Sequence, residues 1–365
     1  MLSEVPGAHA VYSLVRTWEG QTFFDGWDFY GSYDNLTNGD AIWVNKSVAT
    51  TGHLAYIDNN GKAILRVDNF TNVPYNEKRD TVRITTQDSF PVGSVILLDA
   101  LHLPYGCSVW PAFWTRGTKW PIGGEIDIVE IVNLMNHNQM AVHALSGCTK
   151  ATTSQQTGTN NSPNCTNGTG CTVLETNLNS AGAAFANAQG GVWATQFDVS
   201  GASIWFWNRA NLPSNLKNPG SSIDTSGWGL PSAAYPSSTC NISEHFTAQK
   251  LVLDITLCGD WAGVPSVYNA TCSGGTTGLC YTDNVIGAGS PRYDNAYFII
   301  NYVRVYTVDG LASSISSSLH HSSTSSTSKP TTVVSGSGSN AGVVLNISSS
   351  HLFFLLCVGA LAIFI

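Results

Sequence analysis

Residues 123–132 read Gly-Gly-Glu-Ile-Asp-Ile-Val-Glu-Ile-Val, which places three acidic residues between β-branched aliphatic residues. β-branched side chains favour extended backbone, so the stretch predicts a β-strand. Strict alternation would put Glu125 and Asp127 on one face of that strand and Glu130 on the other, among the isoleucines. A β-bulge between Asp127 and Glu130 takes up one residue and returns all three acids to one face. We therefore expect a bulged strand with one acidic face and one apolar face.

The spacing of Glu125 and Glu130 indicates a pair of carboxyl groups that act together in catalysis. Four effective strand steps of about 3.3 Å separate the Cα atoms of Glu125 and Glu130 by roughly 13 Å. Side chains that lean toward each other over Asp127 bring the carboxyls to about 5–6 Å, close to the about 5–5.5 Å of retaining glycoside hydrolysis and below the inverting range. The alternative is a solvated strand that merely carries three carboxylates, which the repulsion between like charges in register disfavours.

The rest of the chain predicts a loop-rich all-β domain. Only 11% of the 365 residues are charged, and 35 are glycine. Short apolar alternating runs separated by Gly, Asn and Pro are typical of a sandwich or jelly roll. The aromatic residues between 18 and 33 are expected to form core. The expected strands are 63–68, 81–85, 94–99, 140–145, 191–199, 202–208, 250–257 and 296–306, the last being central.

The net charge limits the classes of molecule that the protein can bind. The net charge is −8 and the isoelectric point is about 5.5, with no basic patch. Nucleic-acid binding needs a basic surface, so we exclude it. A neutral polymer remains compatible with this composition.

Cysteines and glycosylation motifs predict an extracellular protein. Eight of the nine cysteines precede the stalk described below, and no paired C-x-x-C with nearby histidines indicates zinc, so we expect disulfides whose pairing stays open. Residues 149–172 are expected to form an exposed loop that disulfides hold in place. Eight Asn-x-Ser/Thr motifs that precede the stalk agree with export. They begin at Asn35, Asn45, Asn69, Asn160, Asn164, Asn167, Asn241 and Asn269.

Composition divides the chain into four segments. Residues 1–16 are expected to be a leader without the basic and apolar regions of a signal peptide, so we expect the N-terminal signal to be missing from this sequence. Residues 17–310 form the predicted globular domain, and the Ser/Thr-rich residues 311–342 a disordered stalk. Residues 343–365 consist of a spacer, 343–350, and an apolar end, 351–365, whose fifteen residues fall short of the ~20 needed to span a bilayer as a helix. Together they predict a glycolipid-anchor signal with Asn340 as the leading attachment site. The alternative is a short tail anchor.

Several motifs together are specific to one family. They are Trp110-Pro-Ala-Phe-Trp114, Trp120-Pro121, Gly124–Glu130, His143 with Cys148, Trp228–Pro231 and Leu257–Gly263. Over residues 11–308 the chain resembles the fungal laminarinase-like endo-1,3(4)-β-glucanases of glycoside hydrolase family 16. The resemblance implies a concanavalin-like β-jelly roll, a sandwich of two curved antiparallel sheets with a concave substrate cleft.

The same resemblance implies roles for the acids. Glu125 matches the nucleophile, Glu130 the general acid/base, and Asp127 the carboxylate between them. We expect the coupled cluster to divide these roles, because neighbouring negative charge raises a carboxyl's affinity for a proton. Our hypothesis for Asp127 is that it hydrogen-bonds Glu125 and holds its geometry.

Aromatic residues near the motif are candidate substrate platforms. Trp114 and Trp120 are proposed to stack on sugar faces, and Trp110 is either a further platform or core. His143 matches a histidine that the family places near the acids, although a lone strand histidine can be structural. Trp261 is expected to anchor a loop beside a disulfide.

Three functions follow as alternatives. The first is a retaining endo-β-glucanase that hydrolyses β-1,3 or mixed β-1,3/1,4-glucans. The second is a cell-wall glucan transglycosylase with the same two-glutamate mechanism, which in this family usually carries an acidic motif one residue shorter on an unbulged strand. The third is a non-catalytic carbohydrate-binding protein, which intact Glu125 and Glu130 oppose. We expect no cofactor or catalytic metal; family members sometimes hold structural calcium, but no motif here indicates it. We expect a monomer at the cell surface.

Overall fold

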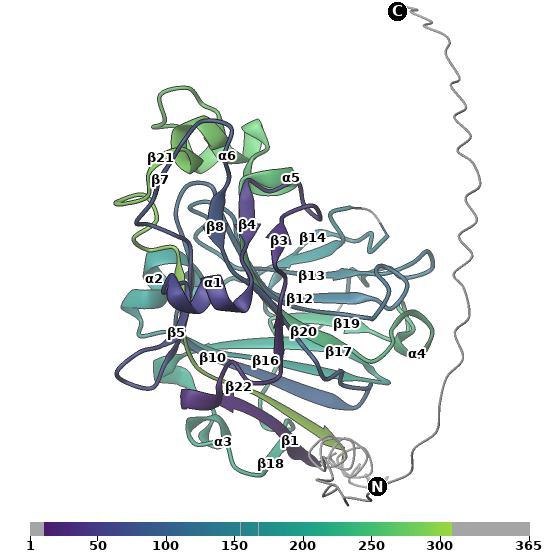
Figure 1. The fold of residues 1–365 in the computed structure, drawn as a ribbon. Coiled ribbons are helices and arrows are strands. Elements are labelled where there is room, and N and C mark those ends of the chain that lie inside the picture. Colours follow the sequence, from purple (N-terminus) through teal and green to yellow (C-terminus); the bar gives the residue numbers. More distant parts are fainter. Residues whose placement is uncertain (1–10, 154, 167, 309–365) are drawn as a thin grey trace, which may run out of the picture. The chain divides into compact units, whose positions relative to one another are not determined.

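A computed structural model describes residues 11–153, 155–166 and 168–308 (Figure 1). The predicted stalk 311–342 with the attachment site Asn340, the tail 343–365, and residues 1–10 of the leader lie outside this part. Among the described residues, no helix is both long and apolar enough to cross a bilayer.

Two large sheets of antiparallel strand pairs lie one over the other (Figure 1), which confirms the predicted all-β sandwich. The first sheet has nine strands. Its order is β18 (Ser222–Asp224), β1 (Val11–Glu19), β22 (Tyr297–Val308), β10 (Ser94–His102), β16 (Gly191–Asp198), β17 (Gly201–Asn208) and β19 (Ala233–Pro236), with β6 (Ala63–Arg66) and then β5 (Ala55–Ile57) attached through β22.

The second sheet has eight strands and includes the acidic stretch. Its order is β14 (Thr159–Ser162), β15 (Cys171–Leu174), β13 (Gln139–His143), β12 (Glu125–Glu130), β11 (Val109–Arg116), β20 (Lys250–Leu257), β9 (Arg83–Thr86) and β2 (Trp27–Phe29). β12 therefore lies inside the sheet, with a strand on each side. A central strand has its backbone paired on both edges, so its side chains point to fixed faces.

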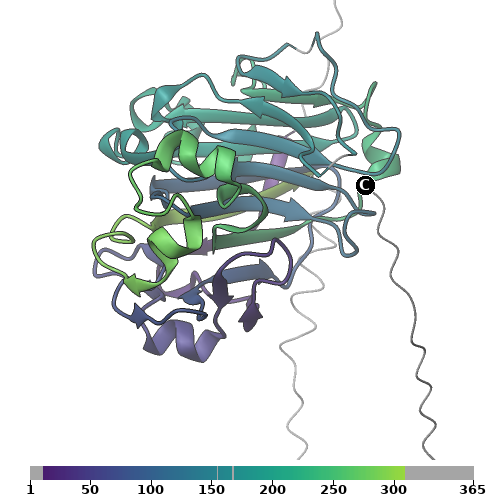
Figure 2. The same cartoon turned by 90° about the horizontal axis from the view of Figure 1, so that it is seen from above.

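Two small sheets and six short α-helices complete the described part. Seen from above, α1 and the pair α5 and α6 gather at one end of the second sheet (Figure 2). The small sheets are β3 (Ser32–Tyr33), β4 (Ala41–Trp43) and β8 (Arg79–Thr81), with β4 and β8 parallel, and β7 (Asn72–Val73) with β21 (Gly287–Ala288). The helices are α1 (Lys46–Thr51), α2 (Gly182–Asn187), α3 (Ser214–Lys217), α4 (Ile242–His245), α5 (Gly259–Ala262) and α6 (Pro265–Cys272).

The main core lies between the two sheets and follows the alternation of the strands. In β10, Ile96 and Leu98 face this core, whereas Val95 and Leu97 face a second apolar cluster on the outer side of the sheet. Burying apolar area of this kind is the dominant favourable term in folding. The aromatic stretch also behaves as predicted, because Trp18, Phe23 and Trp27 are buried in the main core.

Most predicted strands are present, with differences where the chain changes sheet. The predicted strand 250–257 coincides with β20, and 296–306 corresponds to β22, which lies between β1 and β10 as a central strand. The predicted strand 81–85 is instead divided at Val82, because β8 pairs with β4 while β9 pairs with β2 and β20. Alternation alone carries no signal for such a switch of partner.

Two boundaries were wrong. Residues 11–16, which we assigned to the leader, belong to β1, where Tyr12 is buried and the strand pairs with β22. Residues 149–172, which we assigned to a loop, contain β14 and the start of β15 at the edge of the second sheet. Small polar residues weaken a strand pattern, but pairing to an existing sheet edge supplies the missing hydrogen bonds.

Disulfides join all eight cysteines that precede the stalk, as predicted. The expected loop is closed by Cys165–Cys171, and Cys148 at its start is bonded to Cys240. The remaining pairs are Cys107–Cys272 and Cys258–Cys280. Cys107–Cys272 joins the end of α6 to the turn before β11, and Cys258–Cys280 joins the residue before α5 to the segment after α6.

Candidate active site

β12 carries the predicted bulge, and the bulge organises the site. On the β13 side the register shifts between Asp127 and Glu130. On the β11 side Val129 pairs with Phe113 and Asp127 pairs with Trp114, so the residue between them is the extra one. That residue, Ile128, is buried in the main core together with Ile126 and Val129. The three acids therefore share the opposite face of the strand.

His143 lies against two of these acids. It pairs with Glu125 across the β12–β13 ladder, and its Nε2 is 3.7 Å from Glu125 Oε1 and 3.3 Å from Asp127 Oδ2. Gly170, with a φ of +71°, packs on the imidazole, and a Cβ there would lie 2.7 Å from Nε2. His143 is thus held between the acids and a turn that needs glycine.

The contacts of Asp127 differ from the hypothesis. We predicted a hydrogen bond from Asp127 to Glu125. The structure places the Asp127 Oδ2 atom nearest to the His143 imidazole, and this buried oxygen has no partner in hydrogen-bond geometry.

Trp110 contacts the third acid directly. Its Nε1 donates a 3.0 Å hydrogen bond to Glu130 Oε1. The ring of Trp261, on α5, packs edge-on against it with centroids 5.6 Å apart. Trp261 lies three residues after Cys258 of the Cys258–Cys280 disulfide, but it belongs to the short helix α5 and not to a loop as we expected. Trp110 is thus a neighbour of Glu130 and not only core.

Trp114 contacts a buried ion pair, Arg83–Asp254, that the sequence analysis did not predict. Its Nε1 donates a 3.3 Å hydrogen bond to Asp254 Oδ2 on β20. Arg83, on β9, donates to the same oxygen at 2.9 Å and lies over the Trp114 ring, 5.0 Å from its centroid. Leu253-Asp254-Ile255 repeats the pattern of an acid between core aliphatics, which is the signal that could have identified Asp254.

Trp120 lies in the turn that leads into β12. It is 54% exposed, the most open of the four predicted aromatic and histidine site residues. A hydrogen bond from its indole favours the ionised form of Glu125 and so opposes the rise of that group's pKa. The turn closes tightly, because a Cβ on Gly117 would lie 2.4 Å from the Cα of Gly123. Trp120 is therefore held near Glu125 while its ring remains accessible.

Burial and mutual repulsion raise the pKa values of all three acids. For Asp127, burial and then the charge of Asp254 raise the pKa to about 8. For Glu130, burial and then the charge of Asp127 raise the pKa to about 8, against the Trp110 hydrogen bond. The pKa of Glu125 is raised well above its usual value by burial and then by Asp127. The cluster therefore keeps protons to higher pH than separate carboxyls do.

This arrangement has the parts of acid–base and nucleophilic chemistry. One carboxylate can attack while a neighbouring carboxyl, kept protonated by the cluster, donates a proton. The side-chain oxygens and nitrogen of Glu125, Asp127 and His143 also lie within 4.8 Å of one another, a donor set that a divalent cation accepts.

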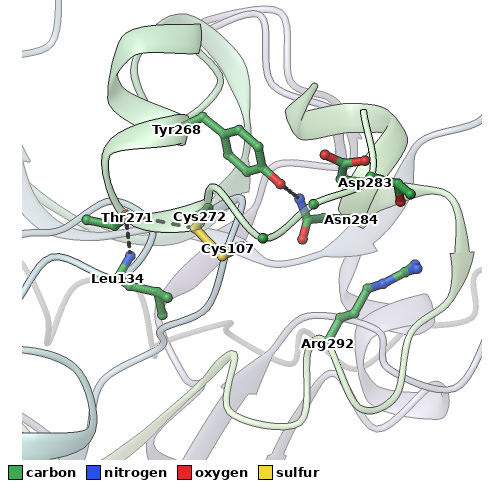
Figure 3. A pocket seen from close by; sticks show the side chains of 11 residues that line it. Cys107, Leu134, Tyr268, Thr271, Cys272, Asp283, Asn284 and Arg292 are labelled. Atoms are coloured by element: carbon green, nitrogen blue, oxygen red, sulfur yellow. Dashed lines mark hydrogen bonds between the residues drawn. A yellow bond between two sulfur atoms is a disulfide. The ribbon is translucent and has the colours of Figure 1, made fainter. Parts of the chain in front are cut away.

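A hollow of about 490 Å³ beside α6 is a separate feature (Figure 3). Its lining includes the Cys107–Cys272 disulfide but none of the acids of β12. The carboxylate of Asp283 accepts hydrogen bonds from the Thr277 and Gly278 N–H groups, and other polar groups there are bonded within the protein as well. The chemistry of the chain therefore centres on β12.

Comparison with known proteins gives consistent results. A family profile described as "XgeA-like, catalytic GH16 domain" matches residues 27–306. A Schizosaccharomyces pombe protein named a probable glycosidase is 37% identical over 303 residues, which cover 81% of this chain and 69% of that protein. The endo-1,3(4)-β-glucanase XgeA of Emericella nidulans is 34% identical over 317 residues, which cover 84% of this chain but only 50% of that protein.

Solved structures agree with the fold. Laminarinase 16A from Phanerochaete chrysosporium, a GH16 protein with β-glucans in its donor and acceptor sites, superimposes with a TM-score of 0.76 at 32% identity, covering 82% of this chain and all of that one. A GH family 16 β-1,3-glucosyltransferase described as elongating gives a TM-score of 0.75 at 35% identity, covering 81% of this chain and all of that one. These likenesses confirm the predicted jelly roll.

Proposed function

The chain belongs to glycoside hydrolase family 16, and from this premise we propose that it is a retaining endo-β-glucanase that hydrolyses β-1,3- or mixed β-1,3/1,4-glucans. The observation that carries the proposal is the bulge of β12, which gives Glu125, Asp127 and Glu130 one common face beside Trp110. The names of the E. nidulans and P. chrysosporium relatives support the same substrate class.

We assign the two chemical roles to the two glutamates. The ionised Glu125 attacks the anomeric carbon, and the protonated Glu130 gives its proton to the departing glycosidic oxygen, which leaves a glycosyl ester on Glu125. Water then attacks the same carbon, Glu130 takes its proton, and the ester bond to Glu125 breaks. The raised pKa of Glu130 agrees with its role as the acid, but the pKa of Glu125 is raised as well, so the division of roles rests on the match to the family motif and not on the pKa values.

The neighbours couple the two glutamates. Asp127 raises the pKa of both Glu125 and Glu130, and the imidazole of His143 opposes that rise at both. Each glutamate also has one indole that favours its ionised form, Trp120 for Glu125 and Trp110 for Glu130. Removing one proton from this group makes the second harder to remove, so a state with one carboxylate and one carboxyl is favoured over a wide pH range.

We propose the aromatic residues as sugar platforms. Trp120 is the exposed member near Glu125, Trp110 borders Glu130, and Trp114 lies between them on β11. Rings that face a cleft stack on the apolar faces of sugars. Their positions on both sides of the acids are suited to a chain that extends past the scissile bond, as endo-hydrolysis requires.

Transglycosylation is the second candidate, and one comparison favours it. A structural neighbour at 35% identity is described as an elongating β-1,3-glucosyltransferase. Both activities pass through the same glycosyl ester and differ in whether water or a sugar hydroxyl attacks it. The longer acidic motif with its bulge leads us to prefer hydrolysis.

Product analysis tests the proposal. Incubation with laminarin should release short oligosaccharides, and proton NMR of the first product should show the β-anomer, whereas an initial α-anomer would exclude retention. Glu125→Gln should lower turnover on the order of 10⁴-fold or more while laminarin binding persists. With excess oligosaccharide acceptor, a dominance of products longer than the donor would identify a transferase instead.

We also propose that the protein works as a glycosylated monomer outside the cell, held to the membrane through a lipid at its C-terminal tail. Four disulfides and eight glycosylation motifs support the compartment. Release of activity from fungal membranes by a phosphatidylinositol-specific phospholipase tests the anchor. Light scattering of the released protein tests the monomer.

A further inference from the structure

The bulge in β12 leaves two backbone groups that a side chain binds. The Asn138 Nδ2 group donates a 2.9 Å hydrogen bond to the carbonyl oxygen of Ile128. The Asn138 Oδ1 atom accepts a 2.9 Å hydrogen bond from the N–H of Glu130. Buried backbone groups almost always have partners, so this one amide takes the place of strand pairing where the register shifts.

Asn138 is itself firmly held. It is fully buried and comes directly before β13. Its N–H donates to Ser180 Oγ at 3.1 Å, and its carbonyl oxygen accepts from the Glu175 N–H at 2.9 Å. The Glu175 carboxylate in turn accepts hydrogen bonds from the N–H groups of Thr176 and Asn177. The segment after β15 therefore fixes the backbone from which the Asn138 amide reaches the bulge.

The side chain at this position needs a particular chemistry. It must donate to one backbone group of β12 and accept from another two residues away. Asparagine offers both groups on a short stem, whereas an ionised aspartate only accepts. Glutamine carries the same amide one carbon further from the backbone, which a fully buried site cannot accommodate without displacement.

We propose that Asn138 is a positioning residue that aims Glu130 at the glycosidic oxygen. The proposal rests on the proposed function, in which Glu130 is the proton donor. Glu130 is held at both ends, at its N–H by Asn138 and at its carboxyl by Trp110. The Asn138 amide sets the direction in which the Glu130 side chain leaves the bulge, and the Trp110 indole sets where its carboxyl stops.

Leaving-group chemistry separates this role from a general effect on the fold. An alkyl glycosidic oxygen needs a proton to depart, whereas a dinitrophenolate departs without one. A misplaced Glu130 therefore slows cleavage of a glucan but not of an activated aryl glycoside. A loss of folded protein lowers both rates by the same factor.

The test compares three variants on two substrates. The variants are Asn138→Ala, Glu130→Ala and Asn284→Ala, and the substrates are laminarin and 2,4-dinitrophenyl β-laminaribioside. Asn284 is the matched control, because its buried amide also donates two hydrogen bonds, to Tyr268 and Cys280, and lies away from β12. The quantity measured is kcat/KM, which reports the first chemical step.

We expect Asn138→Ala to lower kcat/KM on laminarin about 10- to 100-fold and on the aryl glycoside by less than about 3-fold. Asn284→Ala should change kcat/KM on the two substrates by the same factor. Equal losses on both substrates for Asn138→Ala overturn the proposal. If that variant does not fold, Asn138→Asp, which keeps the volume and the acceptor for the Glu130 N–H, undergoes the same comparison with the same two outcomes.

Glu130→Ala distinguishes the two levels of inference. A selective loss on laminarin in this variant supports Glu130 as the acid. If Glu130→Ala is selective and Asn138→Ala is not, only the role of Asn138 fails. If Glu130→Ala lowers kcat/KM on both substrates by the same factor, Glu130 is not the general acid, and the proposed function itself is contradicted.

Discussion

The indole of Trp110 donates a 3.0 Å hydrogen bond to the carboxyl of Glu130, and both residues lie on adjacent strands of the second sheet. This bond favours the ionised carboxylate, whereas burial and Asp127 favour the protonated form. The pKa of Glu130, about 8, is the balance of these opposed effects. Each neighbour can therefore be removed to move the proton affinity of Glu130 in a known direction.

Trp110→Phe should raise the pKa of Glu130, because it removes the donor and keeps the aromatic ring. The alkaline limb of the kcat/KM profile should then move to higher pH by about half a unit to one unit. Measuring laminarin hydrolysis from pH 4 to 10 in both proteins checks this. Trp261→Phe is the control, since its ring packs on Trp110 and should leave the limb in place. A shift to lower pH after Trp110→Phe would contradict the assignment.

Asp127→Asn should act in the opposite direction. The charge of Asp127 raises the pKa of Glu130, so its removal lowers that pKa and moves the alkaline limb toward acid pH by about one unit. The substitution is isosteric, and its effect is therefore electrostatic first. The same pH series provides the measurement, and an unchanged limb would show that Asp127 and Glu130 are not coupled in the working enzyme.

The acidic motif itself was predictable because burial allows few solutions. Glu125, Asp127 and Glu130 could share one face only through a bulge, and the register confirms that bulge. The partners that come from other strands were not predictable in the same way. Asp254 reaches the site through the β11–β20 pairing, and Asn138 through its place directly before β13, and a single sequence does not specify the register of either strand.

The same reason explains the wrong boundaries. Alternation predicts that a segment is extended but not which strand it pairs with. The chain changes partner at Val82 without a glycine or proline to mark the change, and the edge strand β14 consists of polar residues only. The sequence does not decide whether Trp110 is core or a sugar platform, because its contact with Glu130 depends on the residue that the bulge adds.

Arg83→Leu should destabilise the fold strongly. Both partners of the Arg83–Asp254 pair are buried, with side-chain exposures of 4% and 8%, so the variant leaves an unpaired carboxylate in the core of the sheet. The free energy of unfolding should fall by about 3–5 kcal/mol at pH 7.5. Urea denaturation measures this.

The pH dependence of that loss is the diagnostic part. The pKa of Asp254 is already raised to about 6, because burial outweighs Arg83. Without Arg83 it should rise further, so protonation at pH 5 should recover much of the lost stability. Arg83→Lys keeps the positive charge but not the planar contact with Trp43 and Trp114. Its free energy of unfolding should therefore fall by less than that of Arg83→Leu. A loss that is equal at pH 5 and pH 7.5 would exclude the stranded charge as its cause.

The acid cluster should make the protein less stable as pH rises. The pKa of Asp127 is about 8 in the fold and about 3.9 in an unfolded chain. A raised pKa means that this group's contribution to stability is complete below about pH 4 and is lost as pH rises toward 8. Asp127→Asn removes that loss, so the variant should be more stable than the parent at pH 7.5, on the order of 2 kcal/mol, and nearly equal to it at pH 4.

Urea denaturation at both pH values measures the effect, and Asp28→Asn, at an exposed aspartate on β2, is the control that should change little at either. A variant that is destabilised more at pH 7.5 than at pH 4 would contradict the prediction. The expected gain in stability goes with lost control of the proton on Glu130, because the charge that strains the fold is the charge that raises the pKa of that group. Stability and catalysis are therefore opposed at Asp127, as they commonly are where like charges are held together for chemistry.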